Sequence, residues 1–211
     1  MKKIKRIWEI IFTKISIGYI KFVYKTSKVI KTGRVDLLEQ ENLPGVVIGF
    51  WHGDSYCAFP VLRNTGTYVI TTINKRGDYI ENIGKSFRYN VIRVPDESRG
   101  ENHLFKIRKE INGIKKNGLA FALDGPLGPY HVPKKFVLIL ALLTKRKVVP
   151  ASFNVKRKIR LVKRWDKYVV PLPFNKIEIY IHEPIEIKKD EIDDIGKKIT
   201  EDMEKIFLKK E

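Results

Sequence analysis

The sequence has very little cysteine and histidine, and both shortages exclude kinds of site. Cys57 is the single cysteine in 211 residues, so no internal disulfide can form, and the chain is compatible with a reducing compartment. The 4 histidines are His52, His103, His131 and His182, and they lie too far apart in the sequence to match the ligand spacing of a structural zinc site. We therefore expect no structural metal site.

A long uncharged apolar run is also absent. A spanning helix needs about 20 such residues, whereas the longest charge-free stretch, 42–53, contains proline and glycine. Basic residues precede an apolar segment at the N-terminus, but Glu9, Lys14 and Lys21 interrupt it, and no small-x-small cleavage site follows. We expect no signal peptide and no transmembrane span, although the chain can still lie on a membrane surface.

Acidic residues are in short supply relative to basic ones. The chain has 42 Lys and Arg against 24 Asp and Glu, a net charge of +18. Such an excess is typical of proteins with an anionic partner, and nucleic acid, an anionic lipid surface and an acidic protein all qualify. Hydrophobic residues make up 43% of the chain, which is enough to bury the core of one folded domain.

Residues 1–32 are predicted to form a basic amphipathic helix. Its apolar residues fall on one face at helical spacing, and lysines flank them. Those apolar residues are Ile4, Ile7, Trp8, Ile11 and Ile15. A helix of this kind suits the boundary between lipid headgroups and acyl chains, although it can also pack on its own domain with its lysines in solvent. We interpret 1–32 as a membrane-surface helix and 33–211 as a single domain.

The remaining chain alternates between predicted strands and helices. Short runs rich in β-branched residues predict strands at 46–51, 67–73, 91–94, 119–123, 148–154 and 177–181. Helical spacing and length predict helices at 55–62, 77–89, 104–114, 136–143 and 192–206. This alternation indicates an α/β fold with a central, largely parallel mixed sheet flanked by helices.

Polar, turn-rich segments follow two of these strands. His52 and Asp54 come after the first strand, and Asp124-Gly125-Pro126 comes after the fourth. Ligands bind at the carboxyl ends of strands in open α/β sheets, so we expect these loops to share one rim. His52 is the natural proton acceptor there, because imidazole titrates near neutral pH. The alternatives are a histidine that only caps a helix and an Asp-Gly-Pro segment that is only a rigid turn.

A third strand leads into an arginine-containing loop. Arg93 lies in this strand, and Ser98 and Arg99 follow it. Arginine binds phosphate and carboxylate groups well, so Arg93 and Arg99 are candidate anion-binding residues. The alternative is ordinary surface arginine, which is common in a chain this basic.

Five short motifs occur in an order that resembles a known family. They are Phe50-Trp51-His52-Gly53, Arg93 with Ser98-Arg99-Gly100, Asp124-Gly125-Pro126-Leu127-Gly128-Pro129, Val149-Pro150, and Trp165-Asp166 followed by Pro171-Leu172-Pro173-Phe174. With these motifs, the stretch from about residue 46 to 184 resembles the lysophospholipid acyltransferase superfamily. Within it, the chain is most similar to a small bacterial branch related to lipid A acyltransferases.

The resemblance implies a glycerolipid-acyltransferase-like fold and an acyl transfer reaction. In it, His52 is the general base that takes a proton from a hydroxyl of a lysophospholipid or glycolipid. That hydroxyl attacks a thioester of acyl-CoA or of acyl carrier protein. A thioester is already activated, so a base, positioning and oxyanion stabilisation suffice, without a cofactor.

The family pattern also implies a substrate-binding set and a location. Arg93, Ser98, Arg99, Gly125 and Pro126 are the expected substrate-binding residues. The expected partners are a lipid acceptor, the acyl donor and the anionic surface on the cytoplasmic face of the cell membrane, where the protein is peripheral.

Two positions depart from the family pattern. Cys57 stands where the wider superfamily has an acid that orients the histidine, and Leu127 stands where the branch has arginine. Asp124 is our preferred replacement for the orienting acid, because it ends a separate strand, and Asp54 is the second candidate. These departures leave a non-catalytic lipid-binding relative as one alternative, and the net charge leaves a basic nucleic-acid-binding protein as another.

Overall fold

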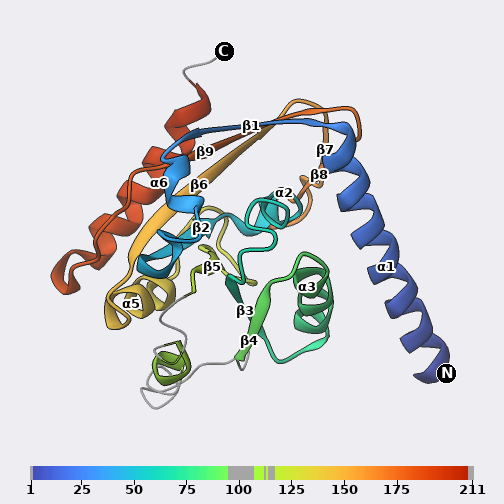
Figure 1. Ribbon diagram of the computed structural model, residues 1–211, viewed down its shortest axis with the longest axis horizontal. Helices are drawn as coiled ribbons and strands as arrows, with labels where there is room; N and C mark the ends of the chain where they lie inside the picture. The colour runs from blue at the N-terminus through green and yellow to red at the C-terminus, as the bar shows by residue number, and fades with distance from the viewer. Residues whose placement is uncertain (1, 95–106, 112, 114–116, 209–211) are drawn as a thin grey trace.

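The computed structural model describes residues 2–94, 107–111, 113 and 117–208, excluding the side chains of 2–6 and 208 (Figure 1). The strands are β1 (Lys28–Gly33), β2 (Val46–Phe50), β3 (Tyr68–Thr72), β4 (Asn90–Val94), β5 (Leu119–Ala122), β6 (Lys147–Val155), β7 (Lys158–Arg160), β8 (Val169–Pro171) and β9 (Lys176–Ile181). The α-helices are α1 (Lys2–Thr26), α2 (Ser55–Ala58), α3 (Lys75–Ser86), α5 (Lys135–Leu143) and α6 (Ile192–Leu208), with 3-10 turns at Val35–Leu38, Leu43–Gly45, His52–Asp54 and Lys189–Glu191. Residues 107–111 and 113 are also helical.

A 7-stranded sheet in the order β1-β9-β6-β2-β5-β3-β4 forms the centre of the molecule. Its neighbouring strands are parallel except for β6 and β9, which pair antiparallel. This arrangement confirms the predicted α/β fold with a largely parallel mixed sheet. β2 lies between β5 and β6, and Val46, Val47 and Ile48 are buried, as expected for a parallel strand covered on both faces.

Two apolar cores cover the two faces of the sheet. One core brings residues of α1, α2 and α3 against the sheet, and the other brings α5, α6 and the helical residues 107–111. Figure 1 shows α5 and α6 on one side and α2 and α3 on the other. The loops at the carboxyl ends of β2 and β5 therefore lie at a rim between two packed layers.

The predicted boundary at residue 32 needs correction. The helix ends at Thr26, and residues 28–33 form β1, which pairs parallel with β9 from Lys28↔Lys176 to Gly33↔Ile181. β1 is an edge strand, where lysine side chains face solvent and discourage pairing with other chains. Because β1 belongs to the central sheet, 1–32 is a helix followed by part of the domain.

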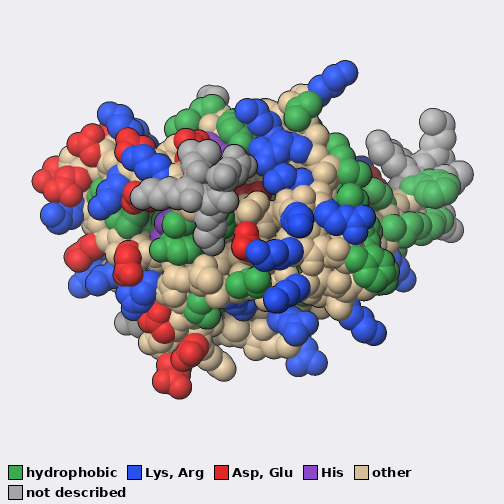
Figure 2. All heavy atoms as spheres, turned by 90° about the horizontal axis from the view of Figure 1, so that it is seen from above, with side chains coloured by type: hydrophobic (Ala, Val, Ile, Leu, Met, Phe, Trp, Pro, Cys, Tyr) green, Lys and Arg blue, Asp and Glu red, His purple; other side chains and the backbone are tan. Residues whose placement is uncertain are grey.

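α1 has one buried and one exposed face. Ser16, Ile20 and Val23 are buried against the domain, whereas Trp8 is 66% and Ile15 64% exposed. The exposed face also carries Ile7, Ile11, Phe12 and Phe22. Figure 2 shows hydrophobic side chains gathered at the α1 end of the molecule, beside Lys and Arg side chains. The apolar face predicted from the sequence is thus not the face that packs on the domain.

No helix in the described part of the chain is long and apolar enough to cross a bilayer.

A small second sheet leaves the end of β6. β7 and β8 pair antiparallel, from Lys158↔Pro171 to Arg160↔Val169. This hairpin was not predicted from the sequence, because β7 and β8 each span only 3 residues. The turn between them carries Trp165 and Asp166 to the rim of the central sheet.

Candidate active site

His52 stands at the carboxyl end of β2, as predicted. Trp51 is extended, and His52 begins a 3-10 turn that ends at Asp54. The hydroxyl of Ser55 donates a hydrogen bond to the carbonyl oxygen of His52 at 2.6 Å. The imidazole is 23% exposed and lines a groove described below.

The imidazole is paired with Asp166. The His52 Nδ1 lies 2.8 Å from Asp166 Oδ2, across 114 residues of sequence. Arg164 donates two hydrogen bonds to the same carboxylate, from Nε to Oδ1 at 2.9 Å and from Nη2 to Oδ2 at 2.8 Å. The tautomer that satisfies the Asp166 contact carries its proton on Nδ1, which leaves the Nε2 lone pair unprotonated.

Electrostatics favour an ionised Asp166 and a neutral His52. Burial alone would raise the pKa of Asp166, but the hydrogen bonds from Arg164 and His52 outweigh it and lower that pKa. Burial lowers the pKa of His52 below its ordinary value; Asp166 opposes this shift, and the charges of Arg164 and Arg76 reinforce it. The imidazole is therefore unprotonated at neutral pH and able to accept a proton.

Two motif glycines make room for the segment that carries Asp166. A Cβ on Gly53 would lie 2.3 Å from the carbonyl oxygen of Asp166, and a Cβ on Gly128 would lie 2.4 Å from Trp165 Cε3. Any other residue at either position would push the 165–166 segment outward. The Trp-His-Gly, Asp-Gly-Pro and Trp-Asp motifs thus meet at one point of the fold.

Asp124 does not hold the imidazole, contrary to the prediction. Its Oδ1 accepts a hydrogen bond from the backbone N–H of His52 at 2.8 Å. The side chain is fully buried, and among the described residues its Oδ2 has no hydrogen-bond partner. Burial raises the pKa of Asp124 to about 6, against the opposing effect of the His52 N–H. Asp124 therefore fixes the backbone of the turn at His52. β5 ends beside β2, so the Asp124 carboxylate meets the main chain of His52 rather than its ring.

Asp54 does not reach the imidazole either. It ends the 3-10 turn that His52 begins, and residues two apart in a turn of three residues point to different sides. Burial raises the pKa of Asp54 to about 7, although the charges of Arg160 and Lys158 lower it. Asp54 therefore faces the β7–β8 hairpin.

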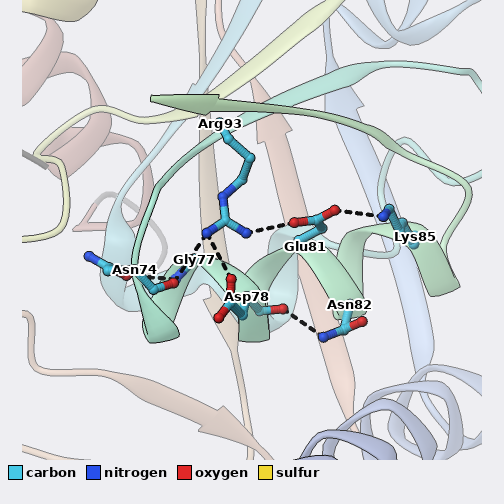
Figure 3. Close-up of polar contacts among 7 residues, drawn as sticks. All are labelled: Asn74, Gly77, Asp78, Glu81, Asn82, Lys85 and Arg93. Atoms are coloured by element: carbon cyan, nitrogen blue, oxygen red, sulfur yellow. Dashed lines mark hydrogen bonds and ion pairs between the residues drawn. The ribbon is translucent and has the colours of Figure 1, made fainter. Parts of the chain in front are cut away.

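Arg93 is paired within the protein and does not line the groove. Its guanidinium contacts Glu81 Oε2 at 2.6 Å and Asp78 Oδ1 at 2.8 Å and donates to the Asn74 carbonyl oxygen at 3.2 Å (Figure 3). Its predicted role in binding substrate anions stays a prediction, and in this structure the guanidinium binds two carboxylates of α3 and does not line the groove. Ser98 and Arg99 lie outside the described residues.

A groove of about 1850 Å³ opens beside His52. Its walls include strand residues such as Ile48, Val69 and Phe121, so much of the lining is apolar. Gly125 and Pro126, two predicted substrate-binding residues, line it as well. Residues of α1 and of the start of α3 also line the groove, and its volume leaves room for a long apolar ligand.

Three functional side chains were missed from the sequence. Asp166 and Arg164 come from the β7–β8 hairpin, and Arg76, at the start of α3, lines the groove. The Trp165-Asp166 motif was part of the family pattern, and it was the available signal for Asp166. Among the residues that the structure describes, no cluster of His, Cys, Asp and Glu is placed to hold a metal ion.

Known proteins that are similar to this chain include a curated sequence and a solved structure. No protein-family model matches the chain. It is 28% identical over 181 residues to an uncharacterized protein of Rickettsia prowazekii, covering 82% of this chain and 80% of that protein. It is also similar to the crystal structure of the 1-acyl-sn-glycerophosphate (LPA) acyltransferase PlsC from Thermotoga maritima, with 17% identity, 92% of this chain and 80% of that chain covered, and a TM-score of 0.47.

Proposed function

We propose that the protein is an O-acyltransferase that moves a fatty acyl group from a thioester donor to a hydroxyl of a lysophospholipid or glycolipid. The observation that carries the proposal is the His52–Asp166 pair at the wall of a large, mainly apolar groove. The pair supplies a base, and the groove offers space for an acyl chain. The ordered motifs of the sequence support the same reaction.

The histidine can serve both halves of the transfer. Nε2 of His52 takes the proton of the acceptor hydroxyl while its oxygen attacks the thioester carbonyl carbon. The C–O bond forms, the C–S bond breaks, and the imidazolium returns its proton to the leaving thiolate. Asp166 keeps the proton on Nδ1 and stabilises the transient positive charge, as carboxylates do in other histidine dyads.

Direct transfer is favoured over a cysteine-linked intermediate. Cys57 is fully buried, and burial raises the pKa of its thiol well above the ordinary value. A buried, protonated thiol is a poor nucleophile. The missing acid at Cys57 was one of two reasons, with Leu127, to consider a non-catalytic relative, and the contact of Asp166 with His52 answers the first of them.

Arg76 and Arg164 are the proposed contacts for an anionic headgroup. Both line the groove, and both lie near enough to His52 to lower its pKa. They replace Arg93 in this role. An acceptor with a phosphate would place its hydroxyl near Nε2 while its charge meets these arginines.

The exposed apolar face of α1 supports a peripheral position on a membrane. Ile7, Trp8 and Ile15 are each about half exposed or more, and Lys14 and Lys21 flank them, a pattern that suits an anionic interface. Ile10 and Phe12 of the same helix line the groove. A lipid acceptor could pass from the bilayer along α1 toward His52, on the cytoplasmic face where acyl donors occur.

The test is a transfer assay with the full-length protein. Two donors with a radiolabelled acyl group, acyl-CoA and the acyl thioester of acyl carrier protein, are offered separately. The acceptor is supplied in vesicles that contain a lysophospholipid or a glycolipid. We expect labelled product lipid with wild type and a loss of roughly 10²–10⁴-fold with His52→Gln, with folding checked by circular dichroism. Equal product formation by both proteins would show that His52 is not the base.

A further inference from the structure

We propose that the basic hairpin, residues 156–167, is a second membrane contact that binds an anionic lipid surface beside α1. The inference rests on the proposed function in one respect: it names the surface from which the lipid acceptor is taken. Vesicle binding is measured without catalysis, so the two proposals can fail separately.

The charge of the basic hairpin fits an anionic surface. Its cations are Lys156, Arg157, Lys158, Arg160, Lys163, Arg164 and Lys167. Its single acid, Asp166, is buried and already paired with Arg164 and His52. Residues 156–164 are exposed without interruption. The hairpin therefore presents positive charge to solvent, and the one acid of its own sequence is buried.

Exposed aliphatic side chains lie between these cations. Ile159 is 52%, Leu161 40% and Val162 66% exposed. Aliphatic residues interleaved with lysine and arginine are typical of segments that enter the headgroup region. There the aliphatic side chains contact acyl chains, and the basic side chains contact anionic headgroups. An acidic protein would match the charge, but it would leave the aliphatic tip unexplained, so we favour lipid.

β8, which pairs with β7 of the basic hairpin, and the residues after it pack on α1, so the hairpin adjoins that helix. The Tyr19 hydroxyl of α1 donates to the Pro171 carbonyl oxygen at 2.8 Å. Phe22 of α1 and Phe174, which follows β8, meet edge to face with centroids 6.1 Å apart. Both rings are exposed, at 48% and 69%. Figure 1 shows β7 and β8 beside the C-terminal part of α1, and in Figure 2 Lys and Arg side chains border the hydrophobic end.

Both segments of this surface contribute to the wall of the groove. Leu161, Arg164 and Trp165 of the hairpin line the groove, as do Ile10 and Phe12 of α1. If both segments contact lipid, the part of the groove that they line lies at the bilayer surface. An acceptor would then reach His52 without crossing water, which explains why the basic hairpin carries both Asp166 and an apolar tip.

Vesicle sedimentation of the full-length protein tests the proposal. The probes are phosphatidylcholine vesicles with and without phosphatidylglycerol. The variants are Val162→Glu and Lys163→Glu, whose residues do not line the groove. The matched controls are Val132→Glu and Lys197→Glu, because Val132 is 50% exposed and Lys197 lies on α6. Circular dichroism confirms that each variant is folded.

We expect both hairpin variants to bind phosphatidylglycerol-containing vesicles roughly 10-fold more weakly than wild type, since each lysine near an anionic surface contributes several-fold to binding. The controls should bind like wild type. Unchanged binding by both hairpin variants would overturn the proposal, as would loss of binding to an acidic acyl carrier protein while vesicle binding persists. Normal vesicle binding by His52→Gln alongside weak binding by the hairpin variants would support docking, whatever the transfer assay shows.

Discussion

Two arginine–carboxylate groups in this protein have similar components and different surroundings. Arg164 holds Asp166, whose side chain is fully buried and whose other partner is the imidazole of His52. Arg93 holds Asp78 and Glu81, which are 63% and 26% exposed, and Glu81 also pairs with Lys85 (Figure 3). The Arg164–Asp166 group contacts the titratable ring of His52, which lines the groove. The Arg93 group contacts only other charged side chains and a backbone carbonyl of the same region.

The difference shows what separates a site from a structural ion pair. Both arginines satisfy their carboxylates, so charge and hydrogen bonding alone do not distinguish them. Asp166 differs because it also contacts Nδ1 of the His52 ring. The other ring nitrogen, Nε2, is then left without a proton and can act as a base. Arg93 instead ties β4 to the first turns of α3, where Gly77 lets the Thr72 carbonyl approach closely.

The largest expected effect is that of Asp166→Asn on acyl transfer. An amide can donate to Nδ1 and so favour the tautomer protonated on Nε2, which cannot act as the base. We expect the rate to fall roughly 10²–10⁴-fold. The midpoint of the acid limb of the pH–rate profile should also move to lower pH, because Asp166 raises the pKa of His52. A rate within a few fold of wild type would place the orienting group elsewhere.

Arg164→Gln should have a smaller effect and an opposite pH shift. Removing the arginine takes two hydrogen bonds from Asp166 and one nearby positive charge from His52. The pKa of His52 should then rise, so the acid limb moves to higher pH, while the rate falls roughly 10-fold or more. The measurement is the same pH–rate profile, with Lys197→Gln on α6 as a matched control. Shifts in the same direction for Arg164→Gln and Asp166→Asn would contradict this account of the charges.

Arg93→Met should affect stability rather than catalysis. The variant leaves Asp78 and Glu81 without their arginine, but both are partly exposed, so we expect a loss of roughly 1–2 kcal/mol in the free energy of unfolding. Urea denaturation gives this value. Transfer activity per folded molecule should stay within a few fold of wild type, and a loss comparable with that of Asp166→Asn would return Arg93 to the substrate site.

The smallest expected effect is a change in the pH dependence of stability with Asp54→Asn. The folded-state pKa of Asp54 is about 7, above the ordinary 3.8, so its stabilising contribution is full below 3.8 and is lost as the pH rises through about 7. Because the side chain is partly exposed, we expect Asp54→Asn to gain roughly 1–2 kcal/mol at about pH 8 relative to about pH 5. Thermal unfolding at both pH values measures it, and an equal effect at the two would disagree with a carboxyl whose folded-state pKa is about 7.

The central strands and His52 could be predicted because their signals are local. Runs such as Val46-Val47-Ile48 identify buried strands, and the carboxyl end of a central strand is where ligands bind in such sheets. β1 was missed because Lys28 and Lys31 suggest a continuation of the basic helix. β7 was missed because three residues, two of them charged, carry no periodic pattern.

The partner of His52 was missed, because its place beside the ring depends on packing between segments that are distant in the sequence. Asp166 reaches the ring only when the hairpin folds back and Gly53 and Gly128 leave space for Trp165 and Asp166. For Arg93 a signal was present: Asp78 and Glu81 are three residues apart and therefore share one helical face. That face lies beside the strand that carries Arg93, so the two carboxylates are close enough to pair with the arginine within the protein.

The most direct test of the central claim is a ¹⁵N NMR measurement of the His52 ring, which needs no substrate. We predict a proton on Nδ1, a bare Nε2 at neutral pH, and a pKa below the ordinary 6.5. Asp166→Asn should change the tautomer, and Asp124→Asn should leave it as it is. A wild-type ring protonated on Nε2, or a ring that responds to Asp124→Asn but not to Asp166→Asn, would contradict the claim that Asp166 prepares His52 as a base.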